Sequence, residues 1–469
     1  MKILLLNPPT ASGVRMVREG RCMQREGAWT SVWSPISLAT IAAVLEKGGF
    51  ETKLVDAITE NVGFTGLGKI IKDFKPNLIV FNTASGSIES DLSMATFAKK
   101  LNPQIKTSTF GIHVSALPDD CFRIEPKLDF IIRGEPEETT LNLAKSLKNN
   151  GGLAVVKGIS WKNGQKIIHN PPQNPIKNLN DLPFPAWEKI DVANYRMPLS
   201  DKPFLLVGTG RGCPYSCVFC ADKVYYSRGL RLPSPFRVVD EIEYDQKRFK
   251  VNDFLFWTES FTLNRDFAIG VCEEIIKRGL KVRFVVNSRV DHVDQQLLVK
   301  LREAGCWQIG FGVESGVNKV LKTMKKCIKV DQIRNAVLAS KQEGLLVTGH
   351  FMIGFPGESR ETILTTIKLA CDLPFDFAQF YCAVPFPGSE LYQQAIDRGW
   401  LESSNWALFE QNFSILTSPN LSAKEIMELR RLAYRKFYLR PRIIFKTLSK
   451  IRSPKYLLKA LTGFVDWAR

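Results

Sequence analysis

Long apolar runs are absent from this sequence of 469 residues: none approaches the roughly 18 uncharged residues that a transmembrane helix needs. The apolar stretch near the start, Ile3–Leu6, is also too short for the core of a signal peptide. Cysteine is scarce, with ten residues, which excludes a small disulfide-stapled scaffold. We therefore expect a cytoplasmic protein whose cysteines serve metal binding or catalysis rather than disulfides.

Acidic residues are in deficit, because 47 Asp and Glu face 64 Lys and Arg, a formal net charge of +17. Hydrophobic residues make up 45% of the chain, enough to fill packed cores, so intrinsic disorder is excluded. The length suggests about two to four domains. The positive charge points to nucleic acid, a membrane surface or an acidic ligand.

Residues 1–150 alternate short apolar runs with helical patterns, which predicts an α/β domain with a doubly wound, Rossmann-like parallel sheet. The expected strands are Ile3–Leu6, Thr52–Val55, Leu78–Phe81, Thr107–Phe110 and Phe130–Ile132. The expected helices are Ser37–Lys47, Leu67–Phe74, Ile88–Leu101 and Glu137–Leu147. Such sheets bind ligands at the carboxyl ends of their strands.

Loop residues gather at those strand ends, and they are the candidate ligand contacts of this domain. They are Asn7, Ser85, Ser87, Gly111, His113, Gly134 and Glu135. Ordinary βα turns are the alternative interpretation of the same residues. The GxGxxG dinucleotide fingerprint is absent, which disfavours a nicotinamide cofactor.

Residues 151–195 form the expected joining segment. Val155–Ile168 has the pattern of a hairpin with Asn163-Gly164 as its tight turn. Five prolines follow between positions 171 and 185, which predicts a stiff, non-helical linker. A second domain is expected over residues 196–400.

The most specific motif is the triplet Cys213, Cys217 and Cys220, a CxxxCxxC pattern in a glycine-rich loop directly after the apolar strand Phe204–Val207. Three thiolates at this spacing suit a [4Fe–4S] cluster with one iron left open for an external ligand. A zinc site would want a fourth Cys or His nearby. Asp222 is the closest oxygen alternative.

Five further strands alternate with helices after the triplet, so six βα-type strands predict a partial (β/α)6 TIM-type barrel. The five are Phe254–Trp257, Val282–Val286, Gln308–Val313, Val347–Ile353 and Phe377–Ala383. Barrel chemistry sits at the carboxyl ends of strands. Polar residues gather at those ends: Thr258-Glu259-Ser260, Asn287-Ser288-Arg289, Glu314-Ser315 and His350.

The triplet and its surroundings resemble the radical S-adenosylmethionine (SAM) superfamily. The resemblance implies that Cys213, Cys217 and Cys220 hold a [4Fe–4S] cluster whose open iron chelates SAM, which is then cleaved to a 5′-deoxyadenosyl radical. It implies the following contacts to SAM: Phe219 near the adenine, Glu259 and Ser260 at the amino group, Asn287 and Arg289 at the ribose or carboxylate, and Glu314 within the strand-four motif.

A doubly wound domain before such a barrel resembles the cobalamin-binding subfamily, which implies cobalamin as a further cofactor in residues 1–150. The DxHxxG motif that supplies a histidine ligand to cobalt is absent, because no Asp precedes His113 in Phe110-Gly111-Ile112-His113. The resemblance then implies that cobalamin binds without a His–Co bond, with His113 as a wall residue. A domain that has lost the cofactor and kept the fold is the alternative.

Residues 401–469 are predicted to be a basic helical tail. Ser422-Ala423-Lys424-Glu425 is a capping-box signature, and Arg440-Pro441 is expected to break the helix that it opens. Two further segments are expected, Ile443–Ile451 and Tyr456–Trp467. Residues 430–469 carry a net charge of +11, which suits an interfacial helix on an anionic membrane. A helical cap on the barrel with a solvated basic face is the alternative.

These observations lead to one functional hypothesis and two alternatives. The hypothesis is a cobalamin-dependent radical SAM C-methyltransferase that acts on an unactivated carbon of a hydrophobic or lipid-like small molecule, through the adenosyl radical and methylcobalamin. An external electron donor of the flavodoxin or ferredoxin type is expected, with peripheral contact to the inner membrane face through the tail. Nucleic acid is disfavoured, because no recognised RNA-binding module is present. The alternatives are radical ring formation or oxidation without methyl transfer, and a non-catalytic cobalamin-binding sensor.

Overall fold

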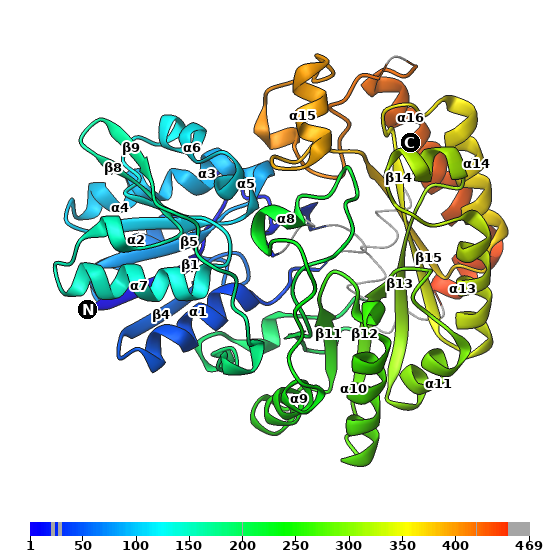
Figure 1. The fold of residues 1–469 in the computed structure, drawn as a ribbon, viewed down its shortest axis with the longest axis horizontal. Coiled ribbons are helices and arrows are strands. Elements are labelled where there is room, and N and C mark those ends of the chain that lie inside the picture. Colours follow the sequence, from blue (N-terminus) through cyan, green and yellow to red (C-terminus); the bar gives the residue numbers. More distant parts are fainter. Residues whose placement is uncertain (20–23, 27–30, 199, 419, 449–469) are drawn as a thin grey trace.

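A computed structural model describes the chain except residues 20–23, 27–30, 199, 419 and 449–469. Two α/β units lie side by side, the first blue to cyan and the second green to orange in Figure 1. The first is built on a seven-stranded sheet and the second on a six-stranded sheet. The predicted mixed architecture is thereby confirmed.

The first sheet has the strand order β4-β1-β5-β6-β7-β8-β9. Its strands are β1 (Lys2–Asn7), β4 (Glu51–Asp56), β5 (Leu78–Asn82), β6 (Lys106–Phe110), β7 (Phe130–Ile132), β8 (Ile159–Asn163) and β9 (Lys166–His169). The first five are parallel, and they coincide with the five predicted strands. Their order places the topological switch, where doubly wound sheets bind ligands, between β1 and β5.

Alternate residues of β1 face opposite sides of this sheet, as the two-residue period of a strand requires. Ile3 and Leu5 pack into one core, whereas Leu4 and Leu6 pack into a second core. The helices that cover the two faces are α1 (Ile36–Lys47), α2 (Phe64–Phe74), α3 (Ile88–Leu92), α4 (Met94–Leu101), α5 (Ile112–Ala116), α6 (Pro118–Ile124) and α7 (Pro136–Lys148). The single helix expected over Ile88–Leu101 is divided at Ser93, and the short helices α5 and α6 were not predicted.

The hairpin predicted in the joining segment is present as β8 and β9, with Gly164 at a φ of +61° in its turn. Strand β8 pairs antiparallel with β7, so the hairpin extends the first sheet. A two-stranded ribbon, β2 (Met16–Val17) with β3 (Gln24–Arg25), belongs to the loop that follows β1.

The second sheet is parallel and runs in chain order from β10 to β15. Its strands are β10 (Phe204–Gly208), β11 (Asp253–Trp257), β12 (Arg283–Ser288), β13 (Cys306–Glu314), β14 (Leu346–Ile353) and β15 (Phe377–Cys382). The helices are α8 (Asp222–Tyr225), α9 (Pro235–Phe249), α10 (Arg265–Lys277), α11 (Gln295–Glu303), α12 (Asn318–Thr323), α13 (Val330–Gln342), α14 (Arg360–Asp372) and α15 (Glu390–Asp397). All six predicted strands are present, and α8, α9 and α12 are helices that were not predicted.

The tail begins with α16 (Ala423–Tyr438), opened by the predicted capping box between Ser422 and Glu425. A new helix, α17 (Pro441–Leu448), starts after the predicted break. Helix α16 covers the barrel beside β15, where the Tyr438 hydroxyl donates to the carbonyl oxygen of Ala378 at 2.9 Å and accepts from its N–H at 3.2 Å. The aromatic side of α16 therefore caps the barrel, which is one of the two roles predicted for the tail.

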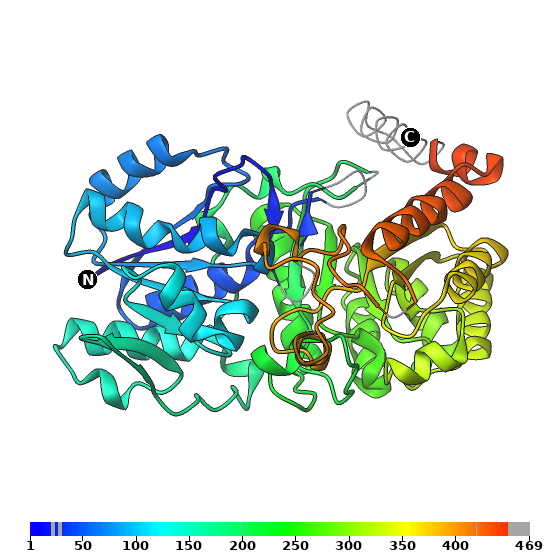
Figure 2. The ribbon, with the colours of Figure 1, turned by 90° about the horizontal axis from the view of Figure 1, so that it is seen from above.

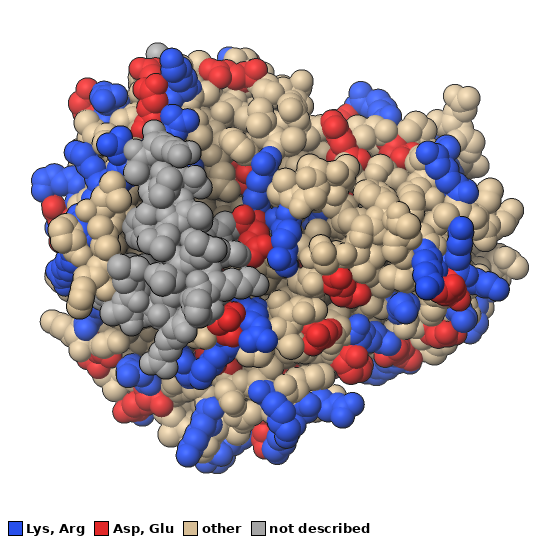
Figure 3. Space-filling view, turned by 180° about the vertical axis from the view of Figure 1, so that it is seen from behind, with Lys and Arg blue, Asp and Glu red and all other residues tan. Residues whose placement is uncertain are grey.

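Segment Tyr456–Trp467 and the end of Ile443–Ile451 lie outside the described residues. Among the residues that are described, no helix is long and apolar enough to cross a membrane. Figure 3 shows Lys and Arg over much of the visible face, interspersed with Asp and Glu.

A buried ion pair lies at the switch point of the first sheet. Both side chains, Arg18 and Asp91, are shielded from solvent, and Arg18 donates to the two carboxylate oxygens at 3.1 and 2.7 Å. Arg18 also donates to the amide oxygen of Asn7, at 2.9 Å, and Ser87 donates to Asp91 at 2.7 Å. The pair thus joins the loop after β1 to the loop after β5.

Replacing Arg18 by leucine should lower the free energy of unfolding by about 3–5 kcal/mol, because Asp91 would remain as an unpaired buried charge. Denaturant titration of the variant measures this loss. The control is Lys2→Ala, which removes an exposed ion pair with Glu51 and should cost less than about 1 kcal/mol. Equal losses in the two variants would contradict this account of the switch point.

Candidate active site

One cavity of about 330 Å³ collects the residues that the sequence singled out in the barrel. Its wall contains all nine predicted barrel positions: Cys213, Cys217, Phe219, Cys220, Glu259, Ser260, Asn287, Arg289 and Glu314. The wall also contains Trp33 and Ile112 of the first unit. The cavity is therefore shared between the two units.

The cysteine loop follows β10 and turns tightly. Gly212 has a φ of +81°, and a Cβ there would lie 2.3 Å from the carbonyl oxygen of Gly229, so glycine is required. The Gly212 N–H donates to the Glu259 carboxylate at 3.1 Å. Further along, the N–H of Val218 donates to the carbonyl oxygen of Met324 at 3.0 Å. Strand β11 and the segment after α12 thus hold the loop from two sides.

Two cations lie near the thiols. Burial raises the pKa of Cys217 to about 11, while Lys326 and Arg289 act in the opposite direction. Lys326 is itself buried and paired with Glu314 at 2.7 Å. A thiol in such a position becomes a ligand when a metal centre supplies further positive charge. Three thiols line one cavity wall, and three thiolates are the donor set that an iron–sulfur cluster with one open iron requires.

Arg289 clamps the loop from the end of β12. Its guanidinium lies 3.5 Å from the ring centroid of Tyr215, and it donates to both oxygens of Asp291 at 2.9 Å. The Tyr215 hydroxyl is 2.6 Å from Nε2 of His292. Arg289 also donates to the carbonyl oxygen of Lys326 at 2.8 Å. Its charge is thus neutralised by Asp291 while its flat face supports the cysteine loop.

Two glycines of β13 make room for polar side chains in successive layers of the barrel. A Cβ at Gly312 would lie 2.7 Å from Nζ of Lys326 and 2.8 Å from Oε1 of Glu314. One layer further in, a Cβ at Gly310 would meet the side chains of Asn287 and His350 at 2.5 and 2.9 Å. Glu314 itself has a φ of +62°, a strained backbone of the kind that gathers at functional sites.

The candidate residues of the first unit lie at the carboxyl edge of its sheet and outside the cavity wall. Asn7 and Ser87 belong to the Arg18–Asp91 cluster, and Ser85 is 3.1 Å from Nδ1 of His113. A Cβ at Gly111, whose φ is +141°, would lie 2.7 Å from the Thr83 hydroxyl, and the N–H of Gly134 donates to Ser115 at 3.1 Å. Glu135 is bound by Arg211 and Arg231 of the second unit.

His113 is fully buried, and burial lowers its pKa to about 3, so its imidazole is neutral at physiological pH. Its Nε2 has no hydrogen-bond partner among the described residues. The ring packs edge to face on Trp406, with 4.4 Å between centroids. Trp406 belongs to the segment after α15, which lies between the two units in Figure 2.

Several residues of this region were not predicted from the sequence. Arg18 lies in a loop rich in Trp and basic residues, and that composition was its only signal. Lys326 and Trp406 carry no motif and reach the site from distant parts of the chain. Arg211 precedes the cysteine triplet by two residues, a position that could have drawn attention to it.

Unsatisfied polar atoms at the edge of the first sheet test whether a large polar cofactor fits there. The side chain of Asn82, the last residue of β5, is buried, and neither its oxygen nor its nitrogen has a hydrogen-bond partner in the part of the chain that the structure describes. The same holds for Nε2 of His113. Because buried polar groups are normally hydrogen-bonded, these atoms fit a ligand that brings its own donors and acceptors.

Comparison with known proteins agrees with both units. A family model described as the radical SAM superfamily matches residues 207–370, and one described as a B12 binding domain matches residues 28–144. An uncharacterized methyltransferase of Pyrococcus horikoshii is 31% identical over 448 residues, covering 96% of this chain and 95% of that protein. An anaerobic magnesium-protoporphyrin IX monomethyl ester cyclase of Rubrivivax gelatinosus is 28% identical, covering 99% of this chain and 82% of that protein.

A solved structure shares the fold. The radical S-adenosylmethionine methyltransferase TsrM from Kitasatospora setae, with cobalamin and a [4Fe–4S] cluster bound, matches with a TM-score of 0.73 at 17% identity, covering 94% of this chain and 89% of that chain. This structure confirms the predicted fold. The near full-length relative and the two family models confirm the predicted family and cofactors. The chain belongs to the cobalamin-binding-domain-containing radical SAM enzymes, a family whose cofactors are a [4Fe–4S] cluster, SAM and cobalamin.

Proposed function

We propose that this chain is a cobalamin-dependent C-methyltransferase that acts on an unactivated carbon of a hydrophobic or lipid-like small molecule. The observation that carries the proposal is the single cavity whose wall holds the three cysteines together with Trp33 and Ile112 of the B12-binding unit. A relative named as a methyltransferase, similar over nearly the whole chain, supports methyl transfer.

The barrel residues divide into two sets. Cys213, Cys217 and Cys220 would hold the cluster. Phe219, Glu259, Ser260, Asn287, Arg289 and Glu314, which line the same cavity, would hold SAM. With SAM bound at these residues, the cluster would supply the radical chemistry needed to remove hydrogen from an unactivated carbon. The electron would come from an external donor of the flavodoxin or ferredoxin type.

Cobalamin would lie against the carboxyl edge of the first sheet. Asn82 and His113 offer it buried hydrogen-bonding atoms without protein partners, and Ile112 connects this edge to the shared cavity. When bound, cobalamin supplies a transferable methyl group. The neutral imidazole of His113, packed on Trp406, serves as a wall of this site.

The distribution of charge along the cavity favours a neutral, largely apolar substrate. Its four charged wall residues, Glu259, Arg289, Glu314 and Lys326, belong to the end with the cysteines and the strand termini. The rest of the wall is apolar or neutral, with Phe204, Leu255, Val285, Trp307, Phe377, Thr348, Gln308, Gln379 and Tyr381 among its residues. An unpaired charge buried there would be costly. An exposed Phe445 on α17, within the basic tail, supports peripheral membrane contact as a route for such a substrate.

Ring formation without methyl transfer is the second candidate. The observation that favours it is the relative from Rubrivivax gelatinosus, named as a cyclase and similar over 99% of this chain. The two reactions share hydrogen abstraction and differ in the fate of the substrate radical.

Replacing Cys213, Cys217 and Cys220 together by alanine should abolish both iron binding and 5′-deoxyadenosine formation, because no other ligand set in the loop can hold the cluster. Anaerobically reconstituted wild-type protein should contain about four irons per cluster. Iron analysis and chromatography of the SAM products measure the two quantities. Cys371→Ala, at the end of α14, is the control and should match wild type. Formation of 5′-deoxyadenosine by the triple variant would refute the proposed role of the triplet.

Protein purified after growth with cobalamin should show a corrinoid absorption spectrum of the form without a bound nitrogen base. His113→Ala should leave that form unchanged, because His113 is assigned to the wall rather than to cobalt. Asn82→Leu should weaken corrinoid binding about tenfold, the equivalent of one lost hydrogen bond. A spectrum that changes in His113→Ala, or a Kd that Asn82→Leu leaves untouched, would contradict this placement.

SAM labelled with a deuterated methyl group distinguishes the two candidate reactions. Extracts of lipids and pigments from cells lacking the gene serve as the substrate pool, and mass spectrometry follows new products. Under the leading proposal, a product heavier by one deuterated methyl group appears. An unlabelled product that has lost hydrogen would instead establish ring formation or oxidation.

A further inference from the structure

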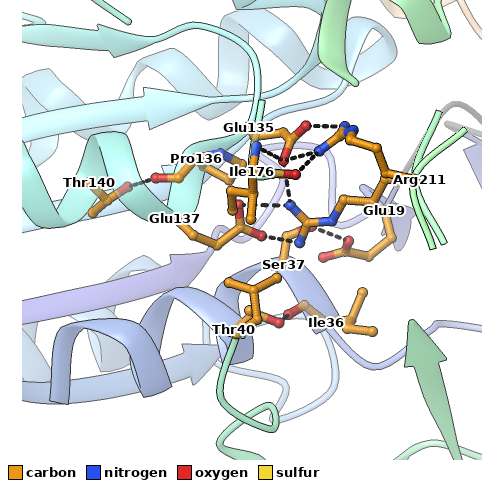
Figure 4. A network of polar contacts seen from close by, with 12 residues as sticks. Glu19, Ile36, Ser37, Thr40, Glu135, Pro136, Glu137, Thr140, Ile176 and Arg211 are labelled. Carbon is orange, nitrogen blue, oxygen red and sulfur yellow. Dashed lines mark hydrogen bonds and ion pairs between the residues drawn. The ribbon is translucent and has the colours of Figure 1, made fainter. Parts of the chain in front are cut away.

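A network of buried charges joins the cysteine loop to the first unit (Figure 4). Arg211, two residues before Cys213, donates from Nη1 to Glu135 at 2.9 Å and to Glu137 at 3.1 Å, and from Nη2 to Glu137 at 2.5 Å. The side chains of Arg211 and Glu137 are only 14% and 3% exposed. Arg211 and Glu137 thus form a bidentate ion pair across the boundary between the two units, and this pair is shielded from water.

A second guanidinium completes the network. Arg231 binds the Glu135 carboxylate and donates to the carbonyl oxygen of Ile176 at 2.7 Å. Arg231 also pairs through its backbone with Arg211, by N–H to carbonyl bonds of 2.9 and 3.0 Å. Two guanidinium groups of the barrel unit therefore face two carboxylates of the first unit.

A third carboxylate, Glu19, lies close by in Figure 4 and accepts from the Ser37 hydroxyl at 2.8 Å. Its complete burial raises its pKa to about 8, so it is mostly protonated at neutral pH. The charges of the network then balance.

The first-unit side of the network is rigid. Glu135 occupies the N-cap position of helix α7, shortly after β7, and Glu137 lies in the first turn of that helix. Carboxylates are stabilised at a helix N-terminus by the helix dipole. Both groups are therefore fixed to the edge of the sheet at which the B12-binding unit receives its ligand.

The barrel side is equally rigid. Only Gly212 separates Arg211 from Cys213, and it is enclosed by the backbone of Gly229 and held by Glu259. A Cβ at Gly210, on the other side of Arg211, would lie 2.9 Å from the Leu232 side chain. A displacement of Arg211 must therefore move the first cysteine of the triplet.

We propose that Arg211 and Glu137 are positioning residues that set the location of the cluster-bearing loop, and hence of SAM, relative to the corrinoid of the first unit. The inference rests on the proposed function. It does not place either side chain in contact with a cofactor. It assigns the bond between them to the alignment of two cofactor sites that lie on different units.

The variant Glu137→Gln tests the inference, because it keeps the shape of the side chain and removes its charge. Two products of SAM distinguish the arrangement within the barrel from the arrangement between the two units. Cleavage to 5′-deoxyadenosine needs only the cluster and SAM within the barrel. Transfer of the SAM methyl group to cob(I)alamin, which leaves S-adenosylhomocysteine, needs both units; titanium citrate supplies the electrons that keep the corrinoid reduced.

We expect Glu137→Gln to reduce S-adenosylhomocysteine formation by about 10–100-fold, the penalty of a displacement on the order of 1 Å, and to leave 5′-deoxyadenosine formation within about twofold. The apoprotein provides a second readout: amide hydrogen exchange over residues 208–212 should become faster. The double variant Arg211→Gln with Glu137→Gln should be no worse than Arg211→Gln alone, because removal of Arg211 already breaks its bond with Glu137.

The matched control is Arg278→Gln. Arg278, the C-cap residue of α10, also binds several carboxylates, those of Glu274, Asp240 and Glu243 at 2.7, 2.7 and 3.0 Å, but all of them belong to the barrel. It should behave as wild type in both products. The charge-retaining variant Glu137→Asp should recover part of the methyl transfer and keeps the test available if Glu137→Gln folds poorly.

Two results would overturn the inference: an unchanged product ratio and exchange rate in Glu137→Gln and Glu137→Asp, or a parallel loss of both products together with iron. Failure of the proposed function is a different result, since wild-type protein would then form no S-adenosylhomocysteine, with or without 5′-deoxyadenosine.

Discussion

The contact between two guanidinium groups of the cysteine loop and two carboxylates of helix α7 is the interaction on which the shared cavity depends. Four buried charges are tolerated only because Arg211 and Arg231 are matched by Glu135 and Glu137 within hydrogen-bonding distance. Since each side of the contact is anchored in its own sheet, the carboxyl ends of both sheets are held toward one cavity. A flexible apolar contact of the same area would leave that relative orientation less well defined.

Within the cavity, charge is separated along the barrel axis, and the glycines of β13 allow that separation. Gly312 leaves space for the Glu314–Lys326 pair beside the cysteines, whereas Gly310 leaves space for Asn287 and His350 one layer further in. The charged end suits a zwitterionic cofactor bound to a cluster. The neutral end suits a substrate that brings no charge into the barrel.

Local patterns in the sequence predicted the elements that local physics determines. Short apolar runs gave the five parallel strands of the first sheet and all six of the second, because a strand buried on both faces has no polar alternation to obscure it. The cysteine triplet was predictable because its ligands lie within eight residues. Helix α9 was missed, since its many charged residues give it little apolar signal. The contact of Trp406 with His113 joins residues nearly 300 positions apart, so no window of the sequence could reveal it.

The first unit shows why strand-end loops are a weaker guide to a binding site than unsatisfied atoms. Asn7 and Ser87 were chosen from the sequence because they follow strands, yet both are bound to the internal pair of Arg18 and Asp91. Asn82 was not among the residues chosen from the sequence, yet its whole amide lies buried without a hydrogen-bond partner among the described residues. A polar group that already has a hydrogen-bond partner in the protein gains little free energy from binding a ligand. A buried polar group without a partner regains the free energy of its desolvation when a ligand supplies one. The amide of Asn82 and Nε2 of His113 are therefore the stronger candidates for cofactor contacts at this edge.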